Sequence, residues 1–567
     1  MSESSGGWTR RRFLETVGLA GGASAVYETM TVLGLINVPE AWAGPPQLPG
    51  ATGSGKSVLI LGAGVGGLTL AYELSRAGFR CEILEAQERA GGRSLTARQG
   101  TVIAEESSDG GVTRQECRFD PGLYLNMGPG RLPYHHRRVL HYCHELGVPL
   151  EIYVMETTAN LFQTDRGFGG KAMVNRRIAN DARGYIAELL AKAVDKGSLN
   201  QELTKDDKEK LLDLLKVFGD LGVEREGGEK CPPDSYCGST RSGCADPLTV
   251  FTSCEPEPKL ALHELLRSEF WKYRFYQPVD FEWQPTLFQP VGGMDQIVHG
   301  FTRRIGHLIH YHSVVLAIRL LEDGVEVTVR DGQTGETTVT RADYCVSNIP
   351  LPLLKQIPAN FSKEFKQAVD QGRFAPTCKV GWQANKRFWE TDDEIYGGIS
   401  WINDPITQMW YPSYDYFTAN GTLTGAYNYS ENAIALGRMS LEQRLVTARK
   451  GAVKLHPEFG DDAIVPQRLG LSVAWQNVPF QRGGWASWGD KEGDDEAYAR
   501  LLEPDGRFHV LGDQVSTLPG WQEGAMMSAE HVLGQIAAPQ ALKVPGILRA
   551  PGRVRAPRTQ RLVEGRS

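Results

Sequence analysis

Three glycines and one glutamate near the start of the chain have the spacing of a dinucleotide-binding site. Gly62, Gly64 and Gly67 form a G-x-G-x-x-G pattern, and Glu85 follows them after about 20 residues. The first glycine permits a sharp turn, the second lets backbone amides approach a pyrophosphate, and the third lets a helix pack closely on a sheet. The glutamate can accept hydrogen bonds from a ribose. This stretch therefore predicts the binding of a dinucleotide.

The elements expected around these residues are the ones that such a site requires. Residues 57–61 are a short apolar run between turn residues, which predicts a buried parallel strand. Residues 68–77 show helical periodicity and end before a glycine, and residues 81–84 form a second apolar run that leads to Glu85. This order places the N-terminus of the helix beside the phosphates, where its dipole favours negative charge.

A second glycine-rich pattern overlaps the first one. Residues 50–57, GATGSGKS, fit the phosphate-binding pattern G-x-x-x-x-G-K-S. That loop should lie between a strand and a helix, whereas here PPQLPG precedes it and a strand follows it. We therefore reject this alternative.

The sequence that follows Glu85, AQERAGGRSLT, resembles the corresponding stretch of the flavin amine oxidases. The resemblance implies that the dinucleotide is FAD rather than NAD, with the G-x-G-x-x-G pattern on its ADP half. It also implies that the second pair of glycines and the arginine after it reach the diphosphate and the flavin. The residues that carry the resemblance are Glu85, Arg89, Gly91, Gly92, Arg93 and Thr96.

Residues 126–133, NMGPGRLP, resemble the G-P-x-R-[IL]-P segment of the L-amino-acid oxidases. The resemblance implies that Arg131 pairs with the α-carboxylate of a substrate. An arginine suits this task because its planar fork gives two parallel, charge-assisted hydrogen bonds. Without this context the same arginine would be interpreted as one half of a structural salt bridge. His135 and His136 follow, but a histidine after a turn is commonly a surface residue at a helix start, so neither is proposed as a base. The residues of this segment expected to contact the cofactor are Gly128, Pro129, Gly130 and Arg131.

The same resemblance implies four more residues with a role in catalysis. Lys379 matches a lysine that is bridged by water to N5 of the flavin. Tyr411, in the sequence WYPS, matches a tyrosine that contacts the substrate carboxylate, and Trp521 matches an aromatic wall of the pocket beside the flavin. Gly484 matches a glycine whose carbonyl accepts a hydrogen bond from the substrate amine. Taken singly, each of these residue types more often belongs to a core or a surface.

Further cofactor contacts are implied in the second half of the chain. The backbone of Val315 is expected at the adenine, and the acid Asp513 at the ribityl chain. The N-terminus of a helix that opens in residues 519–525 is expected to stabilise negative charge at the N1–O2 edge of the flavin. The full set expected in this part of the chain is Val315, Trp475, Gly512, Asp513, Trp521 and Gln522.

The length of 567 residues exceeds one ordinary hydrophobic core, so we expect several domains. The predicted fold class is α/β, with a Rossmann-type FAD-binding domain, a mixed-sheet substrate domain and a helical insertion. The expected parts are a twin-arginine signal peptide (1–43), a linker (44–56), the FAD-binding domain in three pieces (57–130, 286–349 and 495–539), the helical insertion (131–285), the substrate-binding domain (350–494) and a disordered basic tail (540–567).

The first 43 residues have the features of an export signal. Residues 9–14, TRRRFL, fit the twin-arginine pattern, a mildly apolar stretch follows, and Ala41-Trp42-Ala43 supplies a cleavage site. Glu28 and the many small residues make a poor membrane-spanning helix, so no stable membrane anchor is expected. The predicted location is the periplasm or the medium, reached through the twin-arginine export machinery.

Four of the nine cysteines lie close together in one loop-like stretch. Zinc sites need tighter, paired spacings such as C-x-x-C, so disulfides are favoured over a metal and no metal site is predicted. The connectivity of these cysteines stays open. They are Cys231, Cys237, Cys244 and Cys254.

These inferences together predict an FAD-dependent L-amino-acid oxidase. Its substrates would be an amino acid and molecular oxygen, and its products a 2-oxo acid, ammonia and hydrogen peroxide. A monoamine or polyamine oxidase without carboxylate recognition is the main alternative, and a non-catalytic FAD-binding export or maturation factor is a third. The net charge of −7 argues against a nucleic-acid partner. The side chain that the enzyme accepts stays open, as does the choice between monomer and homodimer.

Overall fold

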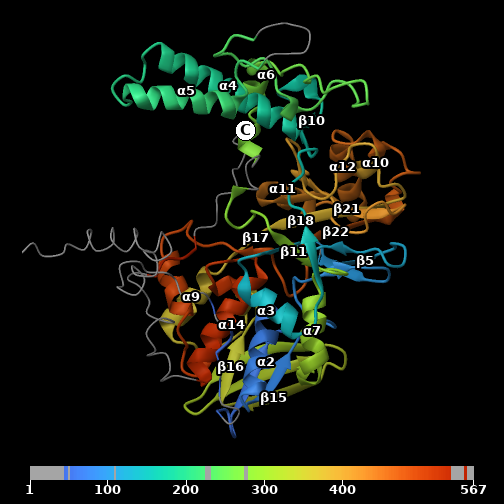
Figure 1. Ribbon diagram of the computed structural model, residues 1–567. Coiled ribbons are helices and arrows are strands. Elements are labelled where there is room, and N and C mark those ends of the chain that lie inside the picture. Colours follow the sequence, from blue (N-terminus) through green and yellow to red (C-terminus); the bar gives the residue numbers. More distant parts are fainter. Residues whose placement is uncertain are drawn as a thin grey trace, which may run out of the picture. The chain divides into compact units, whose positions relative to one another are not determined.

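The computed structural model describes residues 42, 44–46, 48, 52–107, 110–223, 231–273, 279–537 and 554–557 (Figure 1). The chain divides into two units, Met1–Pro45 with Lys543–Arg549 and Pro46–Leu542 with Ala550–Ser567. The predicted twin-arginine leader lies almost entirely outside the described residues, as does most of the predicted tail. Among the helices of the described part, none combines the length and the apolar character needed to cross a membrane.

A five-stranded parallel sheet in the second unit contains the two strands that flank the glycine pattern, β1 and β2. Its strands lie in the order β12-β2-β1-β16-β24. The central strand alternates between two cores, since Val58 and Ile60 face one and Leu59 and Leu61 the other. This explains the continuous apolar run, which is typical of a strand covered on both faces. The strands are β1 (Ser57–Leu61), β2 (Arg80–Leu84), β12 (Ile309–His310), β16 (Tyr344–Ser347) and β24 (Phe508–Val510).

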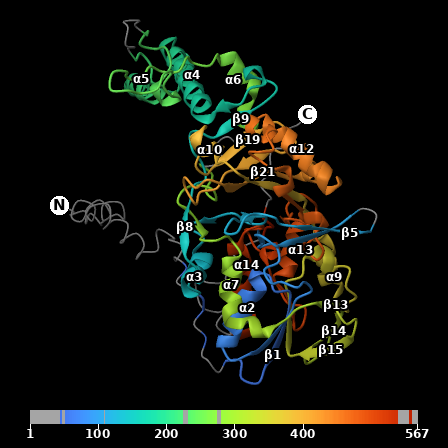
Figure 2. The ribbon, with the colours of Figure 1, turned by 90° about the vertical axis from the view of Figure 1, so that its right-hand side faces the viewer.

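Four helices cover one face of this sheet. They enclose a core to which the sheet contributes Val58, Ile60 and Ile83 (Figure 2). One of them begins only at Arg137, and its Val139 and Tyr142 are fully buried in this core. The predicted boundary of the FAD-binding domain at residue 130 is therefore too early. The helices are α2 (Val65–Arg76), α3 (Arg137–Glu145), α7 (Gln296–Ile305) and α14 (Gln522–Ala537).

The opposite face of the sheet is covered by a small antiparallel sheet and by three further helices. Leu351 and Phe365 are fully buried in this second core together with Leu59 of the sheet. The helices that carry them fall within the predicted substrate domain, so that boundary is also displaced. The elements are β13 (Ser313–Leu320), β14 (Val325–Asp331), β15 (Thr337–Ala342), α8 (Leu351–Leu354), α9 (Lys363–Gln371) and α13 (Asp494–Leu501).

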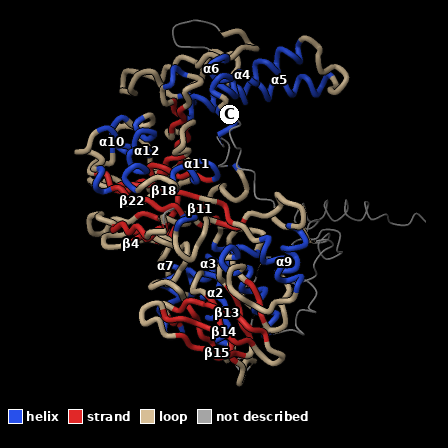
Figure 3. The backbone as a smooth tube through the Cα atoms, turned by 180° about the vertical axis from the view of Figure 1, so that it is seen from behind, coloured by secondary structure: helices blue, strands red, loops and turns tan. Residues whose placement is uncertain are grey.

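A seven-stranded mixed sheet forms the core of the predicted substrate-binding domain. Its order is β10-β9-β19-β20-β21-β18-β22, with one parallel pair, β9 and β19. Cys378, Val380 and Trp382 of β18 pack against three helices on one face (Figure 3). Because successive side chains alternate, Lys379 points to the other face. The strands are β9 (Leu161–Gln163), β10 (Met173–Val174), β18 (Thr377–Ala384), β19 (Ile399–Ile402), β20 (Gln408–Trp410), β21 (Gly421–Tyr429) and β22 (Gly470–Ala474), and the helices are α10 (Phe388–Thr391), α11 (Ser430–Gly437) and α12 (Leu441–Val453).

Short sheets and one buried ion pair join these two parts. Strands β4 and β5 form a hairpin, and Glu105 on it forms a bidentate ion pair with Arg444 of α12 at 2.9 Å for both hydrogen bonds. Both side chains are buried. The remaining strands are β3 (Thr96–Ala97) with β6 (Leu125–Asn126), β4 (Val102–Glu106) with β5 (Val112–Glu116), β7 (Leu132–Pro133) and β8 (Leu150–Tyr153) with β11 (Leu287–Pro290), and β17 (Phe374–Ala375) with β23 (Trp485–Ala486).

The predicted insertion, residues 131–285, is only partly helical. Its strands β7 and β8 pair with β11, and β9 and β10 extend the seven-stranded sheet. The helical remainder consists of α4 (Asn175–Asp195), α5 (Lys205–Gly219) and α6 (Leu262–Ser268), with α4 beside α5 (Figure 1). Disulfides are confirmed as the state of the four clustered cysteines, paired Cys231–Cys237 and Cys244–Cys254. The carboxylate of Asp181 accepts hydrogen bonds from Tyr236, Ser242 and Leu260, which ties this loop to α4.

Part of the predicted disordered tail is packed. Residues 554–557 are described, with Ala556 buried and its backbone N–H donating to Asp495 at 2.8 Å. Val554 and Ala556 contact the second core. The basic composition of the whole tail concealed these small apolar residues, which supply the contact.

Candidate active site

One cavity of about 660 Å³ collects most of the predicted site residues. Its wall runs from the β1–α2 turn, past β13, to the open face of the seven-stranded sheet. The volume is in the range of a cleft for a cofactor and a small substrate. The nucleotide end contains Gly62, Gly64, Glu85 and Val315, and the substrate end contains Arg131, Lys379, Gly484 and Trp521.

The glycine pattern shapes the turn as predicted. Gly62 has a φ of 104°, which favours glycine, and a Cβ on Gly67 would lie 2.3 Å from the carbonyl oxygen of Gly62. Gly67 is therefore a packing residue behind the cavity wall. Gly64 is the N-cap of α2, whose first turn has no acidic residue, so its dipole is open to an anion.

Glu85 lies buried at the end of β2 and faces the turn. Its two oxygens accept hydrogen bonds from the backbone N–H groups of Ala63, at 2.7 Å, and Gln87, at 2.9 Å. Burial raises the pKa of the carboxyl group, and these two donors oppose that shift. The sequence predicted a ribose ligand for this residue. The structure adds that the carboxylate also holds the glycine turn and the following loop in place.

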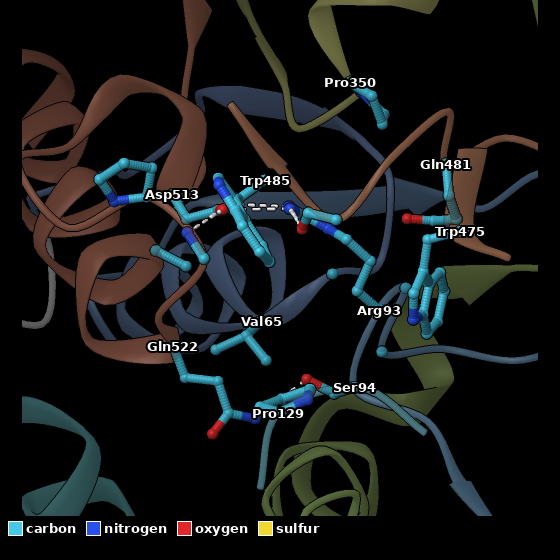
Figure 4. Close-up of a pocket in the computed structure, with 18 of the residues that line it drawn as sticks. Val65, Arg93, Ser94, Pro129, Pro350, Trp475, Gln481, Trp485, Asp513 and Gln522 are labelled. Atoms are coloured by element: carbon cyan, nitrogen blue, oxygen red, sulfur yellow. Dashed lines mark hydrogen bonds and ion pairs between the residues drawn. The ribbon is translucent and has the colours of Figure 1, made fainter. Parts of the chain in front are cut away.

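Arg93 links three segments around the flavin end of the cavity (Figure 4). Its guanidinium donates to the carbonyl oxygen of Gly484 at 2.6 Å and forms an ion pair with Asp513. Asp513 also accepts a hydrogen bond from the N–H of Gly520 at 2.8 Å. The carbonyl predicted to receive the substrate amine is thus already bonded to Arg93, with one lone pair left. Gly512 is not on the cavity wall; its φ of 114° turns the chain so that Asp513 reaches Arg93.

The residues expected beside the flavin come together from distant segments. Trp475 donates its indole N–H to the carbonyl oxygen of Met127 at 3.0 Å. The side-chain amide of Gln522 donates to Ser94 at 2.9 Å, and its carbonyl oxygen is buried with no donor among the described residues. Figure 4 shows Trp475, Pro129 and Gln522 around the same cavity. Gly91, Gly92, Gly128 and Gly130 also line it.

Arg131 is a buried cation without an anionic partner. Its guanidinium carbon lies 3.5 Å from the ring centre of Trp283, 4.8 Å from that of Trp410 and 5.1 Å from that of Trp521. Among the described residues, none forms an ion pair or a hydrogen bond with this side chain, and its Nε is buried without an acceptor. Burial lowers its pKa to about 10, so it stays charged at neutral pH. Three aromatic faces stabilise the charge in part.

Lys379 borders the same aromatic cluster, with its Nζ 5.1 Å from the ring centre of Trp410. Its Nζ donates to the carbonyl oxygens of Gly128, at 2.6 Å, and Asn126, at 3.2 Å, and lies 4.8 Å from the ring centre of Tyr427. Burial, and secondarily the charge of Arg131, lower its pKa to about 7. The amine is therefore neutral in a large part of the population at neutral pH.

Tyr411 requires a correction. It is buried on the far face of the seven-stranded sheet, where its hydroxyl donates to Ser400 at 2.7 Å and meets His456 at 2.6 Å. It does not line the cavity. Neighbouring residues of an extended chain point to opposite sides, so Trp410 reaches the cavity and the adjacent tyrosine cannot.

Glu282 and Trp283 also line the substrate end, and no local sequence pattern predicts either of them there. Both were assigned to the insertion, yet Trp283 stacks on Arg131 and Glu282 accepts hydrogen bonds from two histidines. The distances are 2.8 Å to Nε2 of His136 and 3.2 Å to Nε2 of His135. Ligand atoms of these three side chains lie within 4.8 Å of one another, a spacing that could hold a metal ion. The hydrogen bonds already satisfy Nε2 of both rings, so the arrangement does not require one.

Comparisons with known proteins agree with this geometry. The family model described as flavin containing amine oxidoreductase matches residues 65–533. A putative L-amino-acid oxidase of Bacillus subtilis is 26% identical over 85% of this chain and 94% of its own. A flavin-dependent L-tryptophan oxidase of Lentzea aerocolonigenes is 28% identical over 84% of this chain and 96% of its own. Among solved structures, a putrescine oxidase covers 85% of this chain and 99% of its own with a TM-score of 0.53 and 18% identity, which shows the shared fold.

The residues present fit FAD. The N-terminus of α2 lies on the cavity wall without a side-chain cap, and a Cβ at Gly64 would lie 2.6 Å from Nδ2 of Asn348, so glycine keeps this approach open without displacing the asparagine. At the other end, the buried carbonyl oxygen of Gln522 can accept a hydrogen bond from a ligand N–H. A helix N-terminus suited to a phosphate and a part lined by tryptophans thus lie in one cavity.

Proposed function

Because this chain belongs to the family of flavin-containing amine oxidoreductases and its cofactor is FAD, we propose that it is an L-amino-acid oxidase. It would convert an L-amino acid, oxygen and water to a 2-oxo acid, ammonia and hydrogen peroxide. When bound, FAD accepts the hydride from the α-carbon and passes the electrons to oxygen. The chain's own residues bind the substrate, fix its orientation and exclude water.

The observation that carries this proposal is the unpaired charge of Arg131. A buried ion without a counter-ion is costly, because neither water nor a carboxylate compensates its lost solvation. A substrate carboxylate would remove that cost and form two parallel hydrogen bonds with the guanidinium. The stacked Trp283 limits the directions from which an anion can approach. An amine without a carboxylate would leave the charge uncompensated.

Orientation follows from a second set of groups. A substrate with its carboxylate on Arg131 would lie in the part of the cavity that Trp521 and Lys379 also line. The remaining lone pair of the Gly484 carbonyl oxygen is available to the substrate amine. Lys379, with a pKa of about 7, can hold or release a proton near neutral pH and can hold a water molecule.

The second candidate is oxidation of an amine that has no carboxylate. The solved structures of a putrescine oxidase and a cyclohexylamine oxidase share the fold at 18% and 16% identity. The aromatic cluster itself would suit an amine cation, but Arg131 lies within it and repels one.

The two candidate functions can be distinguished by measuring the Arg131→Leu variant with an L-amino acid and with the corresponding decarboxylated amine. We expect peroxide release from L-amino acids to fall by about two to three decades in kcat/KM, since one partner of a buried charge pair is lost, at about 2–5 kcal/mol. Oxidation of the corresponding decarboxylated amines should change little. Arg114→Leu, an exposed arginine on β5 outside the cavity, is the matched control. A wild type that prefers the amine, or a variant that slows both substrates equally, contradicts the proposal.

For location, we propose export of the folded protein through the twin-arginine pathway, with the leader removed after Ala43. The support is the TRRRFL sequence at residues 9–14 and the cleavage pattern. Folding around FAD before export fits this route, because the cofactor is built into the nucleotide-binding part of the fold.

A further inference from the structure

Glu282 lies at the substrate end, and one of its two carboxylate oxygens accepts no hydrogen bond from the described residues. Its Oε2 accepts the hydrogen bonds from His136 and His135, and Oε1 receives none from the described residues. Burial disfavours the charged carboxylate, but the two histidines more than offset this and lower its pKa, so it is ionised at neutral pH. Glu282 therefore offers the cavity a negative oxygen with free lone pairs.

The other two carboxylates on the cavity wall already have partners on both oxygens. Glu85 holds two backbone N–H groups at the nucleotide end, and Asp513 is paired with Arg93 and Gly520. Glu282, in contrast, directly precedes Trp283, which stacks on Arg131. Its partner His136 contacts the edge of Trp521, with ring centres 4.9 Å apart. One negative and one positive group thus lie on the same aromatic wall at the substrate end.

We propose that Glu282 is the subsite for a positively charged substrate side chain, so that the preferred substrates are basic L-amino acids such as lysine, ornithine and arginine. This inference rests on the proposed function. A basic amino acid carries a carboxylate for Arg131 and a distal cation for Glu282, so each of its charges meets a group of opposite charge on the wall. The histidines hold the carboxylate in place, because Glu282 Oε2 lies between their two N–H groups.

A neutral side chain gains nothing from this arrangement. It would leave the charge of Glu282 without a cation in a partly enclosed site, and an acidic side chain would be repelled by it. The subsite therefore predicts a ranking of basic over neutral over acidic side chains. L-Lysine with L-norleucine and L-arginine with L-citrulline are pairs of similar shape that differ in this one charge.

The test compares kcat/KM for these pairs on the FAD-loaded wild type and on Glu282→Gln. We expect the wild type to prefer the charged member of each pair, and Glu282→Gln to reduce that preference by roughly 10- to 100-fold, as for loss of a hydrogen bond between charged groups. Turnover of norleucine should change far less. Glu116→Gln, an exposed glutamate on β5, is the matched control. The flavin absorbance of each variant reports on its folding.

Several results would overturn the inference. If the wild type shows the same kcat/KM for lysine and norleucine, the proposed subsite is refuted, and this comparison needs no variant. If Glu282→Gln lowers kcat/KM equally for both members of a pair, Glu282 only positions Trp283 and the two histidines. If chelation followed by added Zn²⁺ changes the preference, the three side chains hold a metal instead. Oxidation of norleucine in any of these cases leaves the proposed function intact, whereas oxidation of amines but of neither amino acid refutes the proposed function itself.

Discussion

The buried amine of Lys379 provides a test of the cavity that needs no substrate. Its pKa is lowered from the usual 10.5 to about 7, by burial and then by Arg131. Between these two values the unfolded chain carries a proton on this amine and the folded protein does not. The free energy of unfolding therefore rises with pH across this interval and loses this contribution below pH 7. The whole shift corresponds to about 5 kcal/mol.

Lys379→Met removes this titration and leaves all others. Between about pH 7 and pH 9 the free energy of unfolding of the wild type should rise by about 2 kcal/mol relative to that of the variant. The gain is smaller than the whole contribution of about 5 kcal/mol because this pH range covers only the lower part of the interval between the two pKa values. For a chain of this length the unfolding entropy is on the order of 1 kcal/mol/K, so the difference in melting temperature should grow by about 2 °C.

The assay is the melting temperature of both FAD-loaded proteins, measured at a series of pH values with FAD in excess. The quantity of interest is the wild-type value minus the variant value at each pH. Lys171→Met, at an exposed lysine, is the matched control and should give a constant difference. A constant difference for Lys379→Met as well would refute the lowered pKa and with it the neutral amine at the substrate end.

Three further predictions follow, two from single contacts and one from the export signal in the sequence. Glu85→Ala leaves two buried backbone N–H groups unpaired, at about 1–3 kcal/mol each, and should lower the flavin content measured by absorbance after gel filtration; unchanged flavin content contradicts its role. Arg444→Met leaves the buried Glu105 without its counter-ion, with only the backbone N–H of Ala474 among the described residues still donating to it, and should cost about 3–5 kcal/mol in a denaturation experiment, while removing both charges should restore part of it; no recovery in the double variant would show that packing dominates. The double substitution Arg10→Lys and Arg11→Lys should block export, so that cell fractionation finds flavin-loaded protein in the cytoplasm. Normal export of this variant would exclude the twin-arginine route.

The sequence was most informative where a residue type has few alternatives. Gly62 and Gly67 stand at positions where a side chain is strained or collides, and such positions produce a readable pattern. Arg131 could be predicted because the sequence around it, NMGPGRLP, resembles one segment of a known family. Trp283 was missed because its contact with Arg131 joins segments far apart in the chain, and no local periodicity encodes it.

Errors arose where a local match ignored the direction of a side chain. The WYPS sequence suggested Tyr411 at the substrate, but the alternation along an extended chain places Trp410 there. Domain boundaries were displaced for a related reason. The helix that begins at Arg137 is amphipathic and would fit either domain, and only its contacts with the parallel sheet assign it.

The strand order of the parallel sheet has a consequence for biosynthesis. β1 is translated near the start of the chain, but its neighbour β16 ends at Ser347 and the edge strand β24 ends at Val510. The cavity also needs Gln522, which lies later still. A nascent chain on the ribosome cannot close this sheet, so the flavin can be loaded only when translation is almost complete. A truncated chain that stops before α14 would accumulate without cofactor, and any export of the loaded protein has to wait for the last helix.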